Sequence, residues 1–478
     1  MIISLKGYMV NYFKAPSKTK HQISNKKVTV TVQKLDMNGD GVARFNNKPL
    51  FIAGALPSET IDANIIEQRN KYARATLINI HNKSHHRVTP PCVHFKVCGG
   101  CDLQMLDGAS QLEFKKKKVT ELFSRNINSK LLKNTEKLLV LPWYPPIQSN
   151  AFHYRRKARI GVQFNKKSQA TIGFRQKSTN QLTAIKSCDV LVEPFSNIFP
   201  VLNDLLAKLT IKAAIGHIEL IDAEVINKTT KLPAAKQPII LVVRQLKVMS
   251  SQDKALWLSY SEKYNWYVLI DDGKQKQPLV TATLPKPATF CYTLEDNNKI
   301  YFGASDFIQV NHHVNKNMVK QAIDWLNISP SDHILDLFCG LGNFSLAFAK
   351  HCASVVGVEG IQDMVDKASK NAALNSINNC QFFQADLNSM WQSNSWANAK
   401  VFDKVLLDPA RAGAEKAVEQ ISTLNIPTIL YVSCDPATLA RDSAILLAKG
   451  YVLEKISLMD MFPQTKHVEV MVLFHRHH

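Results

Sequence analysis

The stretch ILDLFCGLGNFSLAFAK, residues 334–350, decides how the chain folds. It begins with an apolar run interrupted by one acid, continues into a glycine-containing turn and ends with apolar residues at helical spacing. This pattern predicts a strand, a tight turn and a helix. The next stretch, SVVGVEG at residues 354–360, predicts a second strand that ends in Glu359, 19 residues after Gly340. Together the two stretches predict the beginning of an alternating β/α domain.

The same alternation continues towards the carboxy terminus. QDMVDKASKNAALN (362–375) predicts a helix, and QFFQAD (381–386), VFDKVLLDPAR (401–411) and TILYVSCDP (428–436) predict three more strands. The fold class is therefore α/β, with a Rossmann-like, doubly wound parallel sheet, and such sheets bind ligands at the carboxyl ends of their strands. Five polar residues stand at or near those ends: Asp336, Glu359, Asp386, Asp408 and Cys434.

Length and composition describe a folded protein of several domains. At roughly 150 residues per domain, 478 residues correspond to about three domains. A hydrophobic content of 45% with 21% charged residues excludes a disordered or fibrous chain. No apolar run reaches the roughly 18–20 residues of a membrane span, and the first 20 residues have no secretory pattern. We expect a cytoplasmic protein without a membrane partner.

The positive charge is concentrated in the first two fifths of the chain. The sequence carries 59 Lys and Arg against 39 Asp and Glu, a net charge of +20. Residues 1–190 hold 32 basic and 11 acidic residues, whereas residues 191–478 hold 27 and 28. Such an excess favours a nucleic acid partner over an ordinary solvated surface. A membrane surface is disfavoured because the basic run Lys115–Lys118 has no long apolar face beside it.

Turn signals and composition divide the chain into four parts. Residues 1–24 are polar and basic and are expected to form a loose tail. From residue 25 to 83, short alternating runs separated by turns such as Asn38–Gly41 predict a small β-barrel of the oligonucleotide-binding type. Residues 84–300 predict a central α/β domain, and residues 301–478 the alternating β/α domain described above.

Four of the nine cysteines are spaced as metal ligands. Three of them stand in PPCVHFKVCGGCDLQ (90–104) and the fourth in AIKSCDVL (184–191). A disulfide framework is not expected in a long cytosolic chain. Three close cysteines and one distant cysteine can hold zinc or an iron–sulfur cluster, and the spacing alone leaves the metal open. The four candidate ligands are Cys92, Cys98, Cys101 and Cys188.

The glycine turn indicates which cofactor the β/α domain binds. A glycine turn followed by an acid about 20 residues later also occurs in dinucleotide dehydrogenases, but Gly340 and Gly342 do not form GxGxxG. The loop resembles that of S-adenosylmethionine methyltransferases, in which the acid after the second strand accepts both ribose hydroxyls. Glu359 suits that role because a carboxylate can accept two hydrogen bonds. A single carboxylate at a strand end is usually an ordinary solvated residue. Several carboxylates at successive strand ends favour a cofactor-binding site.

Three motifs identify a family. DPAR (408–411), SCDPATLARD (433–442) and HVE in KHVEVMVLF (466–474) resemble the RNA (uracil-C5)-methyltransferases, and the resemblance covers nearly the whole chain. It implies that the barrel is a TRAM domain, that the four cysteines hold a [4Fe-4S] cluster and that S-adenosyl-L-methionine is the methyl donor. A barrel combined with these cysteines resembles the branch that acts on 23S ribosomal RNA, which implies conversion of uracil-1939 to 5-methyluridine.

The family motifs also assign site residues. Cys434 matches the nucleophile and Glu469 the base. Phe307 is a candidate for stacking on a flipped-out base, with a core aromatic as the alternative. The positions that match cofactor contacts are Gln309, Phe338, Asn343, Glu359, Asp386 and Asp408.

The chemistry explains why a thiol and a carboxylate are needed. Uracil C5 is a weak nucleophile, so a thiolate must first add to C6, and after methyl transfer a base must remove the hydrogen that remains on C5. Methylation of a tRNA uridine or of another ribosomal uridine is the nearest alternative, and a non-catalytic RNA-binding assembly factor is another. The presence of both Cys434 and Glu469 argues against the latter. A DNA cytosine-C5 enzyme is disfavoured because Ser433, not proline, precedes the cysteine. No stable protein partner is predicted.

Overall fold

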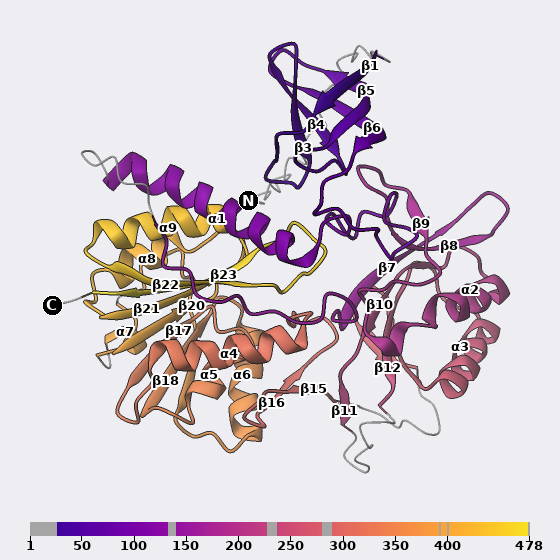
Figure 1. The fold of residues 1–478 in the computed structure, drawn as a ribbon. Coiled ribbons are helices and arrows are strands. Elements are labelled where there is room, and N and C mark those ends of the chain that lie inside the picture. Colours follow the sequence, from indigo (N-terminus) through magenta and orange to yellow (C-terminus); the bar gives the residue numbers. More distant parts are fainter. Residues whose placement is uncertain are drawn as a thin grey trace, which may run out of the picture. The chain divides into compact units, whose positions relative to one another are not determined.

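The computed structural model describes residues 26–131, 140–226, 237–279, 289–391, 393–398 and 401–476. The chain forms two compact units, Met1–Arg87 and Val88–His478 (Figure 1). The predicted basic tail, residues 1–24, lies outside the described residues. Among the described helices, none is both long enough and apolar enough to cross a membrane.

The first unit is a closed barrel. Its sheet order is β1-β5-β6-β4-β3-β2, so β1 and β2 stand at opposite ends of the sheet although only two residues separate them in sequence. One bent strand therefore closes the sheet, and the amides of Val32 and Gln33 continue the pairing by donating to the carbonyls of Glu59 (2.9 Å) and Val42 (2.8 Å). The predicted barrel is confirmed. Its strands are β1 (Lys26–Thr31), β2 (Lys34–Leu35), β3 (Gly41–Phe45), β4 (Lys48–Ala53), β5 (Thr60–Gln68) and β6 (Ala73–Asn82).

Turn residues set the register of the barrel. Asn46 and Asn47 join β3 to β4 with φ of 48° and 59°, the left-handed conformation that a two-residue hairpin turn demands and that asparagine tolerates. The preceding turn is held by the Asp36 carboxylate, which accepts the amides of Asn38 (2.7 Å) and Asp40 (2.9 Å). Alternate side chains then point inward and form a small apolar core.

The second unit contains a seven-stranded central sheet of order β14-β13-β12-β10-β7-β8-β9. Its core contains Trp257 of α3 and Phe199 of α2, both fully buried. The strands are β7 (Lys157–Phe164), β8 (Ala170–Arg175), β9 (Leu182–Ala184), β10 (Ile215–Ile221), β12 (Ile239–Gln245), β13 (Trp266–Asp271) and β14 (Lys276–Pro278), and the helices are η1 (Glu193–Phe195), α2 (Ile198–Lys208) and α3 (Ser251–Tyr264).

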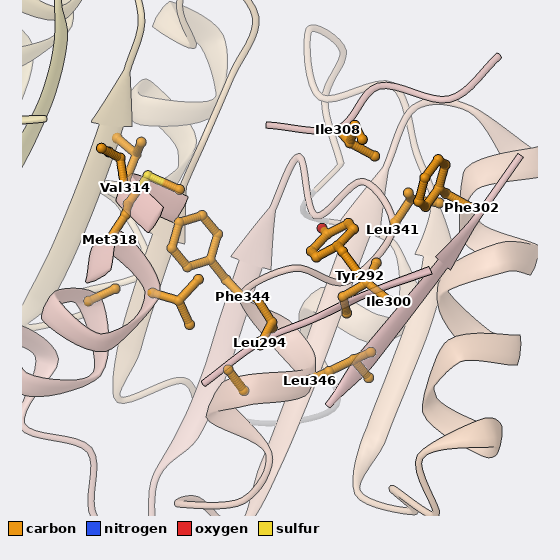
Figure 2. Packing of buried hydrophobic residues seen from close by; sticks show 14 of the residues in the cluster. Tyr292, Leu294, Ile300, Phe302, Ile308, Val314, Met318, Leu341, Phe344 and Leu346 are labelled. Atoms are coloured by element: carbon orange, nitrogen blue, oxygen red, sulfur yellow. The ribbon is translucent and has the colours of Figure 1, made fainter. Parts of the chain in front are cut away.

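A small sheet connects the central part to the carboxy-terminal part. Figure 2 shows Tyr292 and Ile300 from this sheet in one apolar cluster with Met318 of the following helix and with Leu341 and Phe344 of the glycine turn. The turn that the sequence singles out is thus anchored by its apolar side chains. The elements are β11 (Glu224–Ile226), β15 (Thr289–Thr293), β16 (Lys299–Phe302) and α4 (His312–Leu326).

The carboxy-terminal sheet has the order β19-β18-β17-β20-β21-β23-β22. Its first five strands are parallel, as predicted, and β23 runs antiparallel between β21 and β22. The strands are β17 (His333–Leu337), β18 (Ser354–Glu359), β19 (Cys380–Gln384), β20 (Lys404–Leu407), β21 (Thr428–Ser433), β22 (Val452–Met459) and β23 (Glu469–His475). The helices are α5 (Ser345–Phe348), α6 (Gln362–Leu374), α7 (Ser395–Asn398), α8 (Glu415–Ile421) and α9 (Pro436–Ala448).

Helix α1 (Gly108–Leu131) packs against α9 and β22 of the carboxy-terminal part, although it precedes the central sheet in sequence (Figure 1). Its buried Val119 and Phe123 belong to the same apolar core as Leu335 of β17. The Lys115 ammonium, buried on the same helix, donates to the Asp460 carboxylate at 2.6 Å. The loop that follows β22 is therefore in contact with α1.

Candidate active site

The glycine turn after β17 has a backbone that few residue types adopt. Phe338, Gly340 and Gly342 have φ of 65°, 54° and 88°. Such left-handed values strain residues other than glycine, and a Cβ at Gly340 would meet no atom within 4 Å. The space beside Gly340 is therefore open, and a ligand can approach the backbone there.

Glu359 closes one side of this turn. One of its carboxylate oxygens accepts the Gly340 amide at 3.2 Å, and the other accepts the amides of Gly360 (2.8 Å) and Ile361 (3.2 Å). Just after the neighbouring strand β19, Asp386 is exposed and accepts from the Ser389 hydroxyl at 2.7 Å and the Asn388 amide at 3.0 Å. These hydrogen bonds lower the pKa of the Asp386 carboxyl. Both acids thus lie at one edge of the sheet, as predicted from the strand ends.

Two further acids lie under the site. Burial raises the pKa of Asp336 and that of Asp408 to about 7 each. Asp336 accepts the Ser345 hydroxyl on one oxygen, and its other oxygen has no hydrogen-bond partner among the described residues. The charges of Asp408 and Glu359 raise the pKa of Asp336 further, so the acids of three adjacent strands interact.

Strand register brings Cys434 and Glu469 together. Ser433 pairs with Val470 across the antiparallel strands β21 and β23. Cys434, which follows Ser433, and Glu469, which precedes Val470, therefore lie at the same end of this strand pair. Burial raises the pKa of Glu469 to about 8, and the Asp408 charge adds to this effect. Oε2 of this buried carboxyl has no hydrogen-bond partner among the described residues. An unsatisfied, desolvated carboxyl of this kind is typical of a functional site.

The Cys434 thiol lies in a mixed electrostatic environment. Burial raises its pKa, the carboxyls of Glu469 and Asp408 raise it further, and the Arg411 guanidinium opposes them. A thiol next to a carboxyl can transfer its proton and act as a nucleophile, and the same carboxyl can accept a proton from a bound substrate. Arg411 is not among the predicted site residues, although it stands in the DPAR motif that points to the family.

The other predicted cofactor contacts lie around the glycine turn. Gln309 is buried in the segment before α4, where its carbonyl accepts the Arg156 side chain at 2.9 Å. The Asn343 side-chain oxygen accepts from the Tyr292 hydroxyl (2.9 Å) and from the Asn315 amide (3.1 Å), so it is already bonded within the protein. Direct contacts of these residues with a cofactor stay predictions.

Phe307 is not a core aromatic, because 70% of its surface is exposed. The segment that carries it is tied to α6 by Lys367, whose ammonium donates to Asp306 at 2.7 Å. An exposed aromatic ring on a tethered segment can stack on a base.

The four predicted metal ligands line one cavity of about 400 Å³. Burial raises the pKa of Cys101 and that of Cys188 to about 12, and the nearby cysteines contribute to both shifts. Another part of the lining comes from the carboxy-terminal domain, with Arg411 and the β22–β23 loop residues Phe462, Thr465 and His467. Within the described ranges, no group of three His, Cys, Asp or Glu side chains is arranged to hold a single metal ion.

Comparisons with known proteins agree with this geometry. Residues 291–477 match the family model described as tRNA (Uracil-5-)-methyltransferase, and residues 24–78 match the TRAM domain. The 23S rRNA (uracil(1939)-C(5))-methyltransferase RlmD of Colwellia psychrerythraea is 60% identical over 467 residues, which cover 98% of this chain and 99% of the relative. The chain belongs to the RlmD family of uracil-C5-methyltransferases.

Other RlmD enzymes and a solved structure extend the comparison. The RlmD enzymes of Shewanella sp. strain MR-4 and of a Vibrio cholerae strain are 40% and 41% identical, over 98% and 95% of this chain and 99% and 96% of theirs. The crystal structure of the Pyrococcus abyssi tRNA (uracil-54, C5)-methyltransferase in complex with S-adenosyl-L-homocysteine superposes with a TM-score of 0.68 at 21% identity, over 94% of this chain and all of that one. This likeness confirms the methyltransferase fold.

Proposed function

We propose that this RlmD-family enzyme transfers a methyl group from S-adenosyl-L-methionine to C5 of a uridine in 23S ribosomal RNA, uracil-1939, and produces 5-methyluridine through a covalent bond between Cys434 and C6. The observation that carries the proposal is the register that sets the free thiol of Cys434 beside the unsatisfied carboxyl of Glu469. The 60% identity to a curated enzyme of this activity supports the choice of substrate.

The residues at the strand ends fit S-adenosylmethionine. When bound, this cofactor supplies a sulfonium methyl group that a carbanion-like carbon can attack. The open space beside Gly340 supports an approach of the amino acid part to the backbone of the turn, and we assign the ribose hydroxyls to Glu359. To Asp386, after the adjacent strand, we assign the adenine amine. The remaining contacts we assign to Gln309, Phe338, Asn343 and Asp408.

The first chemical step falls to Cys434. Its thiol gives up its proton to solvent water, and the sulfur forms a bond to uracil C6 while the electron pair of the C5–C6 double bond moves towards C5 and O4. C5 then attacks the methyl carbon and the bond between methyl and sulfonium sulfur breaks. Burial and two carboxyls raise the pKa of the thiol and so disfavour the thiolate that this step requires. The positive charge of Arg411 acts in the opposite direction and favours the thiolate.

The second step falls to Glu469. The carboxylate takes the proton from C5, the electron pair of the C–H bond restores the C5–C6 double bond, and the C6–sulfur bond breaks to return the thiolate of Cys434. Burial beside Asp408 raises the pKa of Glu469, so the ionised carboxylate is a stronger base than one in water.

We propose a [4Fe-4S] cluster in a structural role at the cysteine cavity. Four cysteines line one cavity, and burial raises the pKa of each thiol, with neighbouring cysteines raising those of Cys101 and Cys188 further, so a cationic iron site would favour the thiolate forms. We assign the cluster to Cys92, Cys98, Cys101 and Cys188.

The RNA must present its uracil outside the helical stack. A uracil stacked inside folded RNA cannot present its C6 atom to a thiolate of the protein. The excess of 21 positive charges in residues 1–190, from 32 basic and 11 acidic residues, supplies phosphate contacts, and exposed Phe307 provides a ring on which the extruded base stacks.

Labelled methyl transfer tests the proposal. The purified enzyme is given S-adenosylmethionine with a labelled methyl group together with 23S ribosomal RNA or tRNA, and the modified nucleotide is mapped. We expect 5-methyluridine at position 1939 of the ribosomal RNA alone. Label in tRNA with none in ribosomal RNA would reject the substrate, and label in neither RNA with folded protein would reject the activity.

A further inference from the structure

The loop that leads into the candidate base is held by distant parts of the chain. Residues 460–468 join β22 to β23 and end directly before Glu469. Loops normally lie on the surface, yet Met461, Pro463 and Gln464 are buried. The position of Glu469 at the first residue of β23 therefore depends on what packs against this loop.

A reciprocal pair of side chains fixes the middle of the loop. Gln111 of α1 donates its amide to the Gln464 side-chain oxygen at 3.0 Å, and its own oxygen accepts the Gln464 backbone amide at 3.1 Å. Both side chains are buried. Gln464 has φ of 67°, a conformation that residues other than glycine rarely adopt, so the pair holds the loop in a shape that it would otherwise leave.

The cysteine segment contacts the same residue. The amides of Asp102 and Leu103, which directly follow Cys101, both donate to the Gln464 carbonyl at 3.0 Å. The Asp102 carboxylate accepts the Lys466 amide at 3.2 Å. The loop thus forms part of the wall of the cysteine cavity and is bonded to the residues next to a cavity cysteine.

Two further side chains hold the loop at its first residues. The buried Lys115 ammonium donates to the Asp460 carboxylate (2.6 Å) and to the Phe462 carbonyl (3.1 Å). The Tyr154 hydroxyl donates to the Pro463 carbonyl at 2.9 Å. Both Lys115 and Tyr154 stand more than 300 positions before the loop in the sequence.

We propose that Gln111 and Gln464 are positioning residues for Glu469, through which helix α1 and the cysteine segment hold the base at the distance that proton removal from C5 requires. The inference rests on the proposed role of Glu469. It extends that role by making the cysteine segment part of the machinery for product release. Loss of the pair slows the second chemical step and leaves the first step, at Cys434, intact.

Two variants test this. In Gln464→Gly the side-chain pair is lost, but the backbone carbonyl still accepts from Asp102 and Leu103, and glycine adopts the positive φ without strain. In Gln111→Met both hydrogen-bonding groups are replaced by an unbranched apolar chain of similar length. Glu113→Gln, at an exposed position of the same helix, is the matched control, and Glu469→Gln is the reference for a missing base.

The readout is the covalent protein–RNA adduct on denaturing gels after a single turnover with a 23S rRNA transcript. A misplaced catalytic group can cost up to about a hundredfold in rate, and we expect both pair variants to resolve the adduct at least about tenfold more slowly than the wild type. Adduct formation, binding of S-adenosylmethionine and iron content should stay within about twofold. The Glu113→Gln control should behave as the wild type.

The outcomes separate the two proposals. If Glu469→Gln accumulates adduct while folded Gln464→Gly resolves it at the wild-type rate, the pair does not position the base and this inference is wrong. If Glu469→Gln loses activity without accumulating adduct, the assignment of the base itself fails. If Gln111→Met fails to fold, Gln464→Gly still tests whether the pair positions Glu469, because its backbone hydrogen bonds remain.

Discussion

Ser433 pairs with Val470 across the antiparallel strands β21 and β23. This register, in a sheet that is otherwise parallel up to β21, sets the candidate nucleophile of one strand against the candidate base of the other. A slip by one residue would turn the Glu469 side chain to the opposite face of the sheet. The chemistry proposed here therefore depends on a single strand pairing.

Replacement of the nucleophile should separate catalysis from cofactor binding. Cys434→Ala removes the sulfur that forms the bond to C6, so we expect methylation to fall by at least about a thousandfold. Binding of S-adenosylmethionine, measured by calorimetry, should be unchanged. Cys352→Ala, at a buried cysteine in the apolar core, is the control and should keep its activity. Near-normal turnover of Cys434→Ala would exclude the covalent mechanism.

Phe307 should affect RNA turnover and not the cofactor. Stacking of one base on an aromatic ring contributes about 1–3 kcal/mol, so Phe307→Ala should lower kcat/KM for RNA by the corresponding factor. Leu374→Ala removes another exposed apolar side chain, on α6, and should have no effect. Equal kinetics of the Phe307→Ala variant and the wild type would show that this ring does not hold the base.

Stability should depend on pH through Glu469. Burial raises its pKa from 4.5 to about 8, so the folded protein keeps a proton that the unfolded chain releases above about pH 4.5. The free energy of unfolding contributed by this group is fully present below pH 4.5, falls as the pH rises and is lost above about pH 8. Glu469→Gln cannot ionise.

From pH 5 to pH 8 the stability of Glu469→Gln relative to the wild type should therefore rise, by a free energy of unfolding on the order of 2 kcal/mol. The Tm of the variant should rise relative to that of the wild type over the same range. Thermal unfolding at four pH values measures it. The exposed substitution Glu113→Gln should give a Tm difference that is flat over this range. A flat difference for Glu469→Gln as well would mean that the carboxyl is already ionised in the folded protein.

The metal at the cysteine cavity can be identified by colour. Protein purified without oxygen should be brown, with a broad visible absorbance that Cys188→Ser removes, because this variant deletes one of the four thiols that line the cavity. Cys291→Ala, at a buried cysteine outside the cavity lining, should keep the absorbance. A colourless protein with one zinc per chain would identify the site as a zinc site.

The barrel should bind phosphates of the RNA. A chain that begins at Val88 lacks the first compact unit. Each phosphate that a protein neutralises adds about 0.7–0.9 to the slope of log affinity against log salt, so the shortened chain should have a shallower slope. Filter binding at several salt concentrations measures the slope, while affinity for S-adenosylmethionine serves as the control. An unchanged slope would mean that the barrel does not touch the RNA.

The sequence predicts the parts of the site that depend on neighbouring residues. The strand and turn around Gly340 and the acid at Glu359 follow from periodicity and glycine placement within about 25 residues. The barrel hairpin at Asn46 and Asn47 follows from turn preferences in the same way. Each of these features is specified by a short stretch of residues.

Features made by distant segments do not follow from such local patterns. The insertion of β23 between β21 and β22 and the packing of α1 against α9 and β22 depend on contacts between different segments of the chain. The reciprocal contact of Gln111 with Gln464 joins residues 353 positions apart. Neither glutamine stands in a recognisable motif, so only the folded structure reveals that they meet.

The place of β23 between β21 and β22 also governs the order in which the domain can be completed. The chain makes β21 before the hairpin that covers it, so its edge, which runs along the buried Ile429–Val432, stays unpaired until β22 and β23 dock together. A bare apolar edge recruits strands from other molecules. Chains that stop before the hairpin are therefore expected to aggregate.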